Sequence, residues 1–150
     1  MTEEEENEII HKNIKEHGCH ILQIMEENNS PRFSYSIGIQ KTTGQPELII
    51  TGLKFELAHS IINNYNQRIK DGEHFEEGKF YSDFIEGFDI TFKSVEKKHY
   101  KEYLGYGLWL HKGDNFKVMQ MIYPNTSGIW PWDKKAPEDF LWFMPKLYKG

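Results

Sequence analysis

Residues 33–39 read Phe33-Ser34-Tyr35-Ser36-Ile37-Gly38-Ile39 and decide how a sheet can be built from this chain. Bulky and small side chains alternate, which is typical of a β-strand, because successive side chains point to opposite faces. One face of this strand is therefore apolar and the other is nearly bare. A bare face either lies beneath a closely packed helix or forms the floor of a pocket.

A second strand follows across a short turn. The turn spans residues 41–46, and the strand 47–51, with Leu48, Ile49 and Ile50 at its centre, comes directly after Pro46. We predict that the two strands pair as a hairpin. Glu47 opens the second strand, so its carboxylate could accept hydrogen bonds from turn amides or present an acceptor to a ligand.

Apolar periodicity predicts the remaining elements. The expected helices cover residues 3–17, 54–70 and 97–111, and the expected strands cover 19–25, 88–95 and 116–123. Glycines in residues 71–87 favour a long loop with a short strand at 79–82. Four prolines in the last part of the chain argue against a regular element there, so residues 134–150 are expected to form an irregular aromatic tail.

This order of elements predicts a single α+β domain, with a mixed, mostly antiparallel sheet and helices packed on one face. A length of 150 residues suits one domain, and residues 1–17 form its acidic N-terminal helix. The expected core consists of Phe33, Tyr35, Ile37, Leu48, Ile50, Leu57, Ile61, Tyr65, Ile90, Phe92, Leu104, Val118 and Ile122.

The charge distribution bears on the choice of partner. The net charge is −5, and residues 1–30 hold eight acidic side chains against two lysines. An acidic segment on a near-neutral body disfavours nucleic acid, whose phosphates attract basic surfaces. The same segment would suit a protein partner with a basic surface, although a solvated helix face also explains it.

Cysteine use and hydropathy favour the cytoplasm. Cys19 is the only cysteine, so no intramolecular disulfide can form, and the acidic N-terminus does not resemble a signal peptide. No apolar run reaches the roughly eighteen residues that a membrane helix needs. We therefore expect a cytoplasmic protein with no membrane partner.

No motif of high specificity identifies a catalytic site. Neither glycine-rich phosphate-binding motif occurs, and no pair of histidines or cysteines has metal-ligand spacing. His17, Cys19 and His20 crowd one junction, which we interpret as a polar joint, and we expect no metal and no cofactor. Cys19 lies in an apolar run, which favours an inert buried thiol. The balance favours a binding protein over an enzyme.

The candidate binding residues lie in two stretches. Gln120 is polar on an otherwise apolar strand face, so a buried Gln120 must find hydrogen-bond partners. Trp130 and Trp132 flank Pro131 after a turn, and these indoles could hold a flat ligand or a partner, or could merely cap the core. The full set of expected ligand- or partner-binding residues is Ser34, Tyr35, Ser36, Gly38, Glu47, Gln120, Trp130, Trp132 and Asp133.

These motifs, in this order, resemble a bacterial family known only as domain of unknown function 4262. The resemblance rests on strand 33–39, Pro46-Glu47-Leu48, Gly52-Leu53, Ala58, Asn63 or Asn64, Gln120, Gly128, Pro131, Trp132 and Asp133. It covers roughly residues 18–133 and implies a single α+β domain, but no activity. The chain departs from the family pattern at Asn125 and Thr126, where many members carry an acid, and in the aromatic run 136–150, which replaces a short glycine-rich tail.

Two functions remain open. The first is a binding module that docks a protein partner, for example an immunity protein or antitoxin that neutralises a toxin. The second is a small-molecule or nucleotide pocket, or an enzyme of unknown reaction, floored by the bare face of strand 33–39. Glu47 and Gln120 would be its polar contacts, and Trp132 its lid. Both hypotheses require the bare strand face and the tryptophans to converge on one surface.

Overall fold

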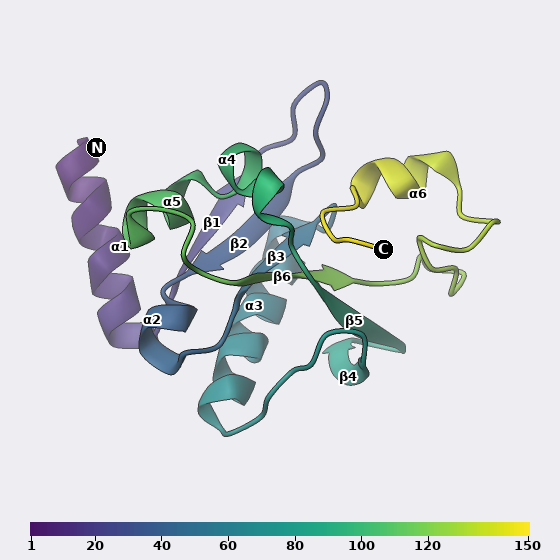
Figure 1. The fold of residues 1–150 in the computed structure, drawn as a ribbon, viewed down its shortest axis with the longest axis horizontal. Helices are drawn as coiled ribbons and strands as arrows, with labels where there is room; N and C mark the ends of the chain where they lie inside the picture. The colour runs from purple at the N-terminus through teal and green to yellow at the C-terminus, as the bar shows by residue number, and fades with distance from the viewer.

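A six-stranded sheet runs through the centre of the protein in the computed structural model, which describes residues 1–150 (Figure 1). The strands are β1 (His20–Ile24), β2 (Phe33–Ile37), β3 (Glu47–Thr51), β4 (Phe80–Ile85), β5 (Phe88–Ser94) and β6 (Val118–Ile122). They lie in the order β1-β2-β3-β6-β5-β4, and every neighbouring pair is antiparallel except β3 with β6. The expected α+β class, the mostly antiparallel sheet and the β2–β3 hairpin are confirmed.

The sheet carries helices on both faces, rather than on the one face that the sequence led us to expect. The helices are α1 (Glu3–His17), α2 (Ile39–Thr43), α3 (Phe55–Lys70), α4 (Tyr100–Tyr103), α5 (Gly105–His111) and α6 (Glu138–Phe143), with a 3₁₀ turn at Lys97–His99. The core on the α3 side contains Leu48 and Ile50 of β3, while Ile49 belongs to a second core with α4 and α5. Both faces of this central strand are apolar, so both need a cover. No helix combines the length and the apolarity needed to cross a bilayer.

The expected core residues are buried, except for one on α3. Leu57 is 41% exposed, whereas its neighbour Ala58 is 1% exposed. The buried stripe of α3 runs through Ala58, Ile61, Ile62 and Tyr65, at the spacing of a helix face. Leu57 lies one position outside that stripe, which is why the periodicity alone misplaced it.

Strand β2 ends two residues earlier than the sequence pattern suggested. Gly38 has a φ of 103° in the left-handed region, and α2 begins at Ile39 in place of the expected turn. A Cβ at Gly38 would lie 2.7 Å from Cγ1 of Ile14 on α1. Glycine at this position therefore permits both the turn of the backbone and the close approach of α1.

The C-terminal segment contains a helix where an irregular tail was predicted. Pro137 precedes α6 and Pro145 follows it closely, so these prolines bound the helix and do not interrupt it. The segment packs on the body of the protein, because Leu147 and Tyr148 are buried and Tyr148 forms a β-bridge with Val95. Figure 1 shows α6 at the opposite end of the molecule from α1.

Candidate functional site

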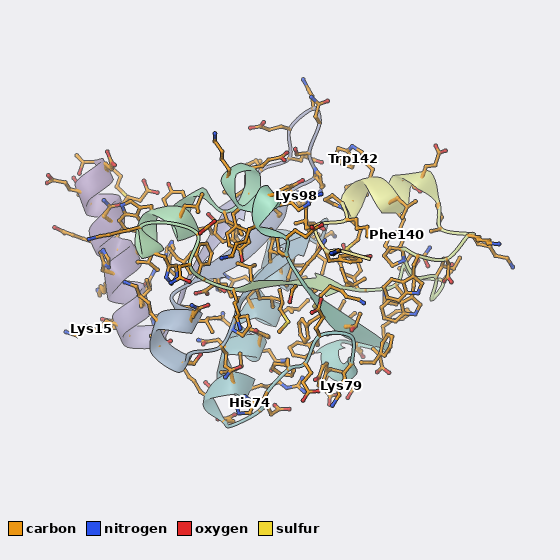
Figure 2. All side chains as sticks on the ribbon, in the orientation of Figure 1. Lys15, His74, Lys79, Lys98, Phe140 and Trp142 are labelled. Carbon is orange, nitrogen blue, oxygen red and sulfur yellow. The ribbon has the colours of Figure 1, made fainter.

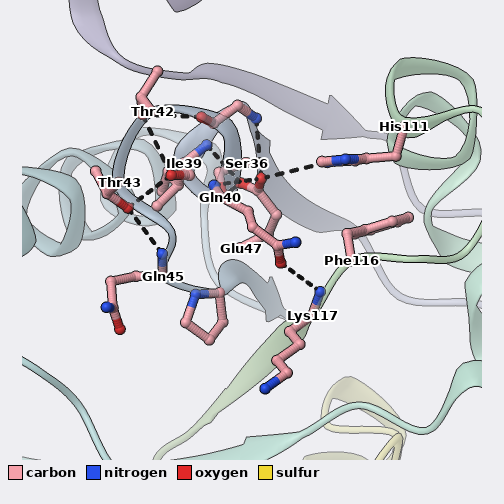
Figure 3. Close-up of polar contacts among 12 residues, drawn as sticks. Ser36, Ile39, Gln40, Thr42, Thr43, Gln45, Glu47, His111, Phe116 and Lys117 are labelled. Atoms are coloured by element: carbon pink, nitrogen blue, oxygen red, sulfur yellow. Dashed lines mark hydrogen bonds and ion pairs between the residues drawn. The ribbon is translucent and has the colours of Figure 1, made fainter.

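Glu47 is the most completely buried acidic side chain of the candidate residues, with 1% exposure at the start of β3. Its carboxylate accepts four hydrogen bonds of 2.8 to 3.1 Å, from the Ser36 hydroxyl and the backbone amides of Gly38, Ile39 and Gln40 (Figure 3). The first amides of a helix have no partner within the helix, so an acceptor placed there stabilises it. Glu47 thus fastens the start of α2 to the sheet.

The rest of this internal network extends to β6. The Ser36 hydroxyl also accepts a hydrogen bond of 3.0 Å from the amide of Leu48. The Gln40 side chain accepts one of 2.7 Å from the amide of Lys117, next to the start of β6. The polar side chains of this network therefore tie β2, α2, β3 and β6 together.

His111 is a second titratable side chain beside Glu47, and sequence reasoning did not assign it to this place. Its Nε2 lies 4.0 Å from Oε2 of Glu47, and its ring stacks on Phe116 with 4.5 Å between centroids (Figure 3). The side chain is 10% exposed, and Nε2 has no hydrogen-bond partner. Because α5 supplies His111, only the tertiary packing of α5 beside β3 brings residues 47 and 111 together.

A hydroxyl, a carboxylate and an imidazole thus lie close to one another, in the residue types of a nucleophilic triad. In such a triad the imidazole accepts the hydroxyl proton and the carboxylate orients the imidazole. Here the Ser36 hydroxyl donates to Glu47 directly, and Ser36 is 0% exposed. The Ser36 hydroxyl is thus bonded to the carboxylate and not to the imidazole. The contact joins β2 to β3 inside the protein and does not have the arrangement of a triad.

The bare face of β2 lies beneath α3. Ser34 and Ser36 are 1% and 0% exposed, and Ser34 pairs with Ile50, which belongs to the core on the α3 side. Tyr35 points to the opposite core, where its hydroxyl accepts a hydrogen bond of 3.1 Å from the amide of Tyr106. Of the two alternatives for this strand, the structure has the covering helix, and the face forms no open floor.

Gln120 finds its partners in the C-terminal segment. It is 0% exposed on β6, its Nε2 donates to the carbonyl of Pro145 at 2.8 Å, and its Oε1 accepts from the amide of Leu147 at 3.2 Å. A buried carboxamide satisfied in this way holds the segment after α6 against the centre of the sheet.

The junction of His17, Cys19 and His20 has no geometry for a metal. No three histidine, cysteine, aspartate or glutamate side chains anywhere in the chain lie close enough together to hold an ion. Cys19 is 5% exposed, and burial raises the pKa of its thiol to about 12. The thiol is therefore protonated near neutral pH, and a protonated thiol is a poor nucleophile and metal ligand.

Trp130 and Trp132 form a row of rings with Phe80 of β4, the strand at one edge of the sheet. Trp130 and Trp132 stack with centroids 5.1 Å apart and an interplanar angle of 6°, and Phe80 of β4 meets Trp130 edge-on at 5.3 Å. The Asp133 carboxylate accepts a hydrogen bond of 2.9 Å from the Trp130 amide, which closes the turn. Phe80 and Trp132 are 55% and 47% exposed. We call Phe80, Trp130 and Trp132 the ring cluster.

A hollow of about 430 Å³ lies beside the ring cluster, lined by Trp132 and by Leu141 of α6. Lys93 and Lys146 also line it, with their ammonium groups 5.9 and 5.4 Å from the centre of the Tyr148 ring. The hollow therefore combines an apolar floor with two ammonium groups, of which that of Lys146 already donates to an oxygen of Gly150 in the same lining. Figure 2 shows Phe140 and Trp142 on opposite sides of α6, the helix that also carries Leu141 of the hollow.

The structure separates the candidate residues into two groups that do not meet. Strand β2 lies next to one edge of the sheet and β4, which carries Phe80, forms the other edge. The internal group consists of Ser34, Tyr35, Ser36, Gly38 and Glu47. The group at the aromatic end consists of Trp130, Trp132 and Asp133. Gln120 is buried on β6, between the two groups. The two groups therefore do not form the single surface that we expected. The pocket hypothesis loses its floor, and the docking hypothesis rests on the aromatic end alone.

Comparison with known proteins gives a family without an activity. The model of a family described as "Domain of unknown function (DUF4262)" matches residues 13–137. No curated protein matches the chain, and no solved structure matches it. The matched range includes the network around Glu47 and the ring cluster, and it ends before α6.

Proposed function

Because the chain belongs to the domain of unknown function 4262 family, whose name carries no activity, we propose its function from the surface that the fold presents. We propose that the protein is a binding module that docks a protein partner through its aromatic end. The observation that carries this proposal is the exposed ring cluster beside the hollow of Trp132 and Leu141.

Exposed aromatic area of this kind is suited to binding. Phe80, Trp132 and Leu141 are 55%, 47% and 40% exposed, and Trp142 on α6 is 40% exposed as well. Contiguous exposed apolar surface is rare on a protein that works alone, and tryptophan is enriched among the residues that dominate interface energies.

The ring cluster is also held in place before any partner arrives. The indoles support each other by stacking, Phe80 supports Trp130 from the side, and Asp133 fixes the backbone of the turn. Rings that are already ordered lose little conformational entropy on binding, so more of the contact energy contributes to affinity.

The charge near the hollow bears on the partner's chemistry. Lys93 and Lys146 line the hollow. We therefore expect the partner to insert an apolar side chain whose neighbouring residues are neutral or acidic. A basic partner surface, as inferred from the acidic N-terminal residues, would fit α1 at the other end of the molecule and would act through electrostatic steering. An immunity protein or antitoxin is one form that such a module could take.

The test uses two exposed tryptophans at opposite ends of the protein. Trp132 is 47% exposed in the ring cluster, and Trp109 is 40% exposed on α5 beside His11 of α1. We expect wild type and Trp109→Ala to recover the same stoichiometric partner from cells of the source organism, and Trp132→Ala to lose it. Thermal unfolding of all three proteins checks that both variants are folded.

Two results would contradict the proposal. Recovery of an identical partner by Trp132→Ala would show that the ring cluster does not bind. Loss of the partner in Trp109→Ala alone would move the interface to the acidic end of the molecule.

A further inference from the structure

Strand β1 forms one edge of the sheet, at the end of the molecule that carries α1 (Figure 1). It pairs with β2 alone, so one row of its backbone N–H and C=O groups has no neighbour in the sheet. Such a row is a template for another extended chain, and proteins commonly blunt it with a bulge, a charge or a proline.

The opposite edge strand, β4, is blunted in two ways. Its register against β5 shifts between Tyr81 and Ile85, and Asp83 places a charge in this stretch with a φ of 67°. Strand β1 has neither device, because its pairing with β2 is continuous from His20 to Ile24 and it contains no proline. His20 is its only titratable side chain, and burial lowers the pKa of His20, so β1 is uncharged near neutral pH. The edge of β1 thus remains able to pair.

The outward backbone groups of β1 belong to Ile21 and Gln23. The amide of Gly52 donates to the carbonyl of Arg32 at 2.9 Å, so residues 32, 34 and 36 turn their backbone groups toward β3. Because this direction alternates along a strand, residues 33, 35 and 37 bond to β1, where their partners are residues 24, 22 and 20. The amides and carbonyls of Ile21 and Gln23 therefore face away from the sheet.

A hollow of about 860 Å³ lies along this edge, lined by residues 19–21 together with α1 and α3. The two helices lie on opposite faces of the sheet, because Ile10 of α1 belongs to one core and Ile61 of α3 to the other. The edge of β1 is therefore recessed between two helices. The volume falls within the range of binding sites, roughly 300–1,000 Å³. The proposed docking function makes no use of this hollow.

The walls of the hollow suit the backbone of a peptide. Each peptide group has a donor and an acceptor, and a side-chain carboxamide offers the same pair. Asn63 is exposed on α3, and its carboxamide forms no hydrogen bond within the protein. The amino groups of Asn13 and Gln67 contact His20 and Asp71, which leaves their carbonyl oxygens as acceptors. The outer edge of an added strand therefore meets both donors and acceptors.

We propose that an extended segment of a partner protein adds to β1 as a further strand of the sheet, in the hollow between α1 and α3. Backbone hydrogen bonds to Ile21 and Gln23 provide the affinity, as in other cases of strand addition. The segment carries polar, uncharged side chains, because Glu16 and Lys70 are the only lining residues with a charge in their usual state and they have opposite signs. A second copy of this chain does not fit, since its own β1 is recessed between the same two helices.

The test follows the backbone amides of the full-length ¹⁵N-labelled protein by NMR. The probe is the neutral peptide acetyl-Thr-Gln-Thr-Gln-Thr-amide, because recognition through the backbone tolerates different side chains. We expect saturable downfield shifts of the Ile21 and Gln23 amide protons, with a Kd of about 1 mM, the affinity that about four backbone hydrogen bonds provide. The same peptide with every backbone nitrogen methylated keeps the side chains but cannot donate, and it should not bind.

Two variants at one position test the edge itself. Gln23→Pro removes the outward N–H group at an edge position, where proline is tolerated. It should weaken binding of the peptide at least about five-fold, the effect of one hydrogen bond, as followed at the Ile21 amide. Gln23→Ala is the matched control, because it also loses the side-chain contact with the carbonyl of Phe55 but keeps the backbone amide. It should bind like wild type, and circular dichroism checks that both variants are folded.

The proposal is overturned if the Ile21 and Gln23 amides do not shift, or if the methylated peptide binds as well as its parent. Equal losses in Gln23→Ala and Gln23→Pro would overturn it too. Shifts of these amides with the concentration of the protein alone would assign the edge to a second copy and contradict the proposal. The methylated peptide leaves the protein unchanged, so the test remains decisive if Gln23→Pro does not fold. None of these results bears on the ring cluster, whose test is separate.

Discussion

Single polar side chains hold the parts of this molecule together. Glu47 ties α2 to the sheet, and Gln120 ties the C-terminal segment to β6. Gly52 acts through the absence of a side chain, since a Cβ there would lie 2.6 Å from the carbonyl oxygen of Phe143 in α6. All three belong to the pattern that gave the family resemblance. That pattern therefore describes how the fold is assembled more than it describes a binding surface.

Replacing the buried carboxylate tests this role of Glu47. Glu47→Gln keeps the size of the side chain but turns one acceptor into a donor that faces other donors. We expect the free energy of unfolding to fall by about 1.5–3 kcal/mol, the range for hydrogen bonds to a charged group. Urea denaturation measures it, with Glu86→Gln in the exposed β4–β5 turn as the control. Equal, small effects in both variants would contradict the role assigned to Glu47.

Helices and strands were largely predictable where the side-chain pattern is local. The alternation at residues 33–37 follows the two faces of one strand, and the periodicity of residues 55–70 follows the one buried face of a helix. Both patterns are properties of the segment itself. The helix α2 was missed because its first turn depends on the carboxylate of Glu47. The break at Leu104 between α4 and α5 was missed too, since only Gly105 and Gly107 signalled it.

The candidate site was less predictable than the elements. The meeting of Glu47 with His111 depends on how α5 packs, and the burial of Ser34 depends on α3. Both are tertiary contacts between segments far apart in the sequence. The exposure of Trp132 likewise depends on where the C-terminal segment packs, which no local pattern encodes.

The junction of β2, α2 and α1 allows a matched test at the scale of the element. Gly38 and Gly44 flank α2 with φ values of 103° and 81°, but only a Cβ at Gly38 meets a neighbour, at 2.7 Å from Ile14. Alanine at Gly44 should cost about 1–2 kcal/mol from backbone strain alone. Alanine at Gly38 should cost at least about 1 kcal/mol more, from the added steric overlap.

Unfolding by urea compares these two variants. A further variant, Gly38→Ala with Ile14→Ala, should recover part of the difference between them, because it removes the overlapping side chain. Equal losses at Gly38 and Gly44 would show that α1 does not pack against this turn as described.

At the scale of the whole molecule, the region that the family model matches is smaller than the folded unit. Residues 138–150 contribute the buried side chains of Met144, Leu147 and Tyr148, and they lie outside the matched range. Deletion of residues 138–150 should lower the free energy of unfolding by more than about 3 kcal/mol, because it uncovers apolar surface and removes both backbone hydrogen-bond partners of Gln120.

Chemical denaturation and dye binding to exposed apolar surface measure this effect. Substitution of the exposed Trp142 by alanine is the control, since it removes a large side chain of the same segment without opening the core. A truncated protein as stable as wild type would show that the segment is an accessory to the fold.

The parallel pairing of β3 with β6 affects how the chain can be made in the cell. Residues 47–49 pair with residues 118–120, so nearly half of the chain, residues 50–117, lies between the two paired segments. Until β6 has left the ribosome, the nascent chain carries a strand of apolar residues with one open edge, which favours pairing with other chains. We therefore expect slow synthesis, or many ribosomes on one message, to increase the dependence of folding on chaperones. This effect arises before β6 has paired and the folded surface has formed.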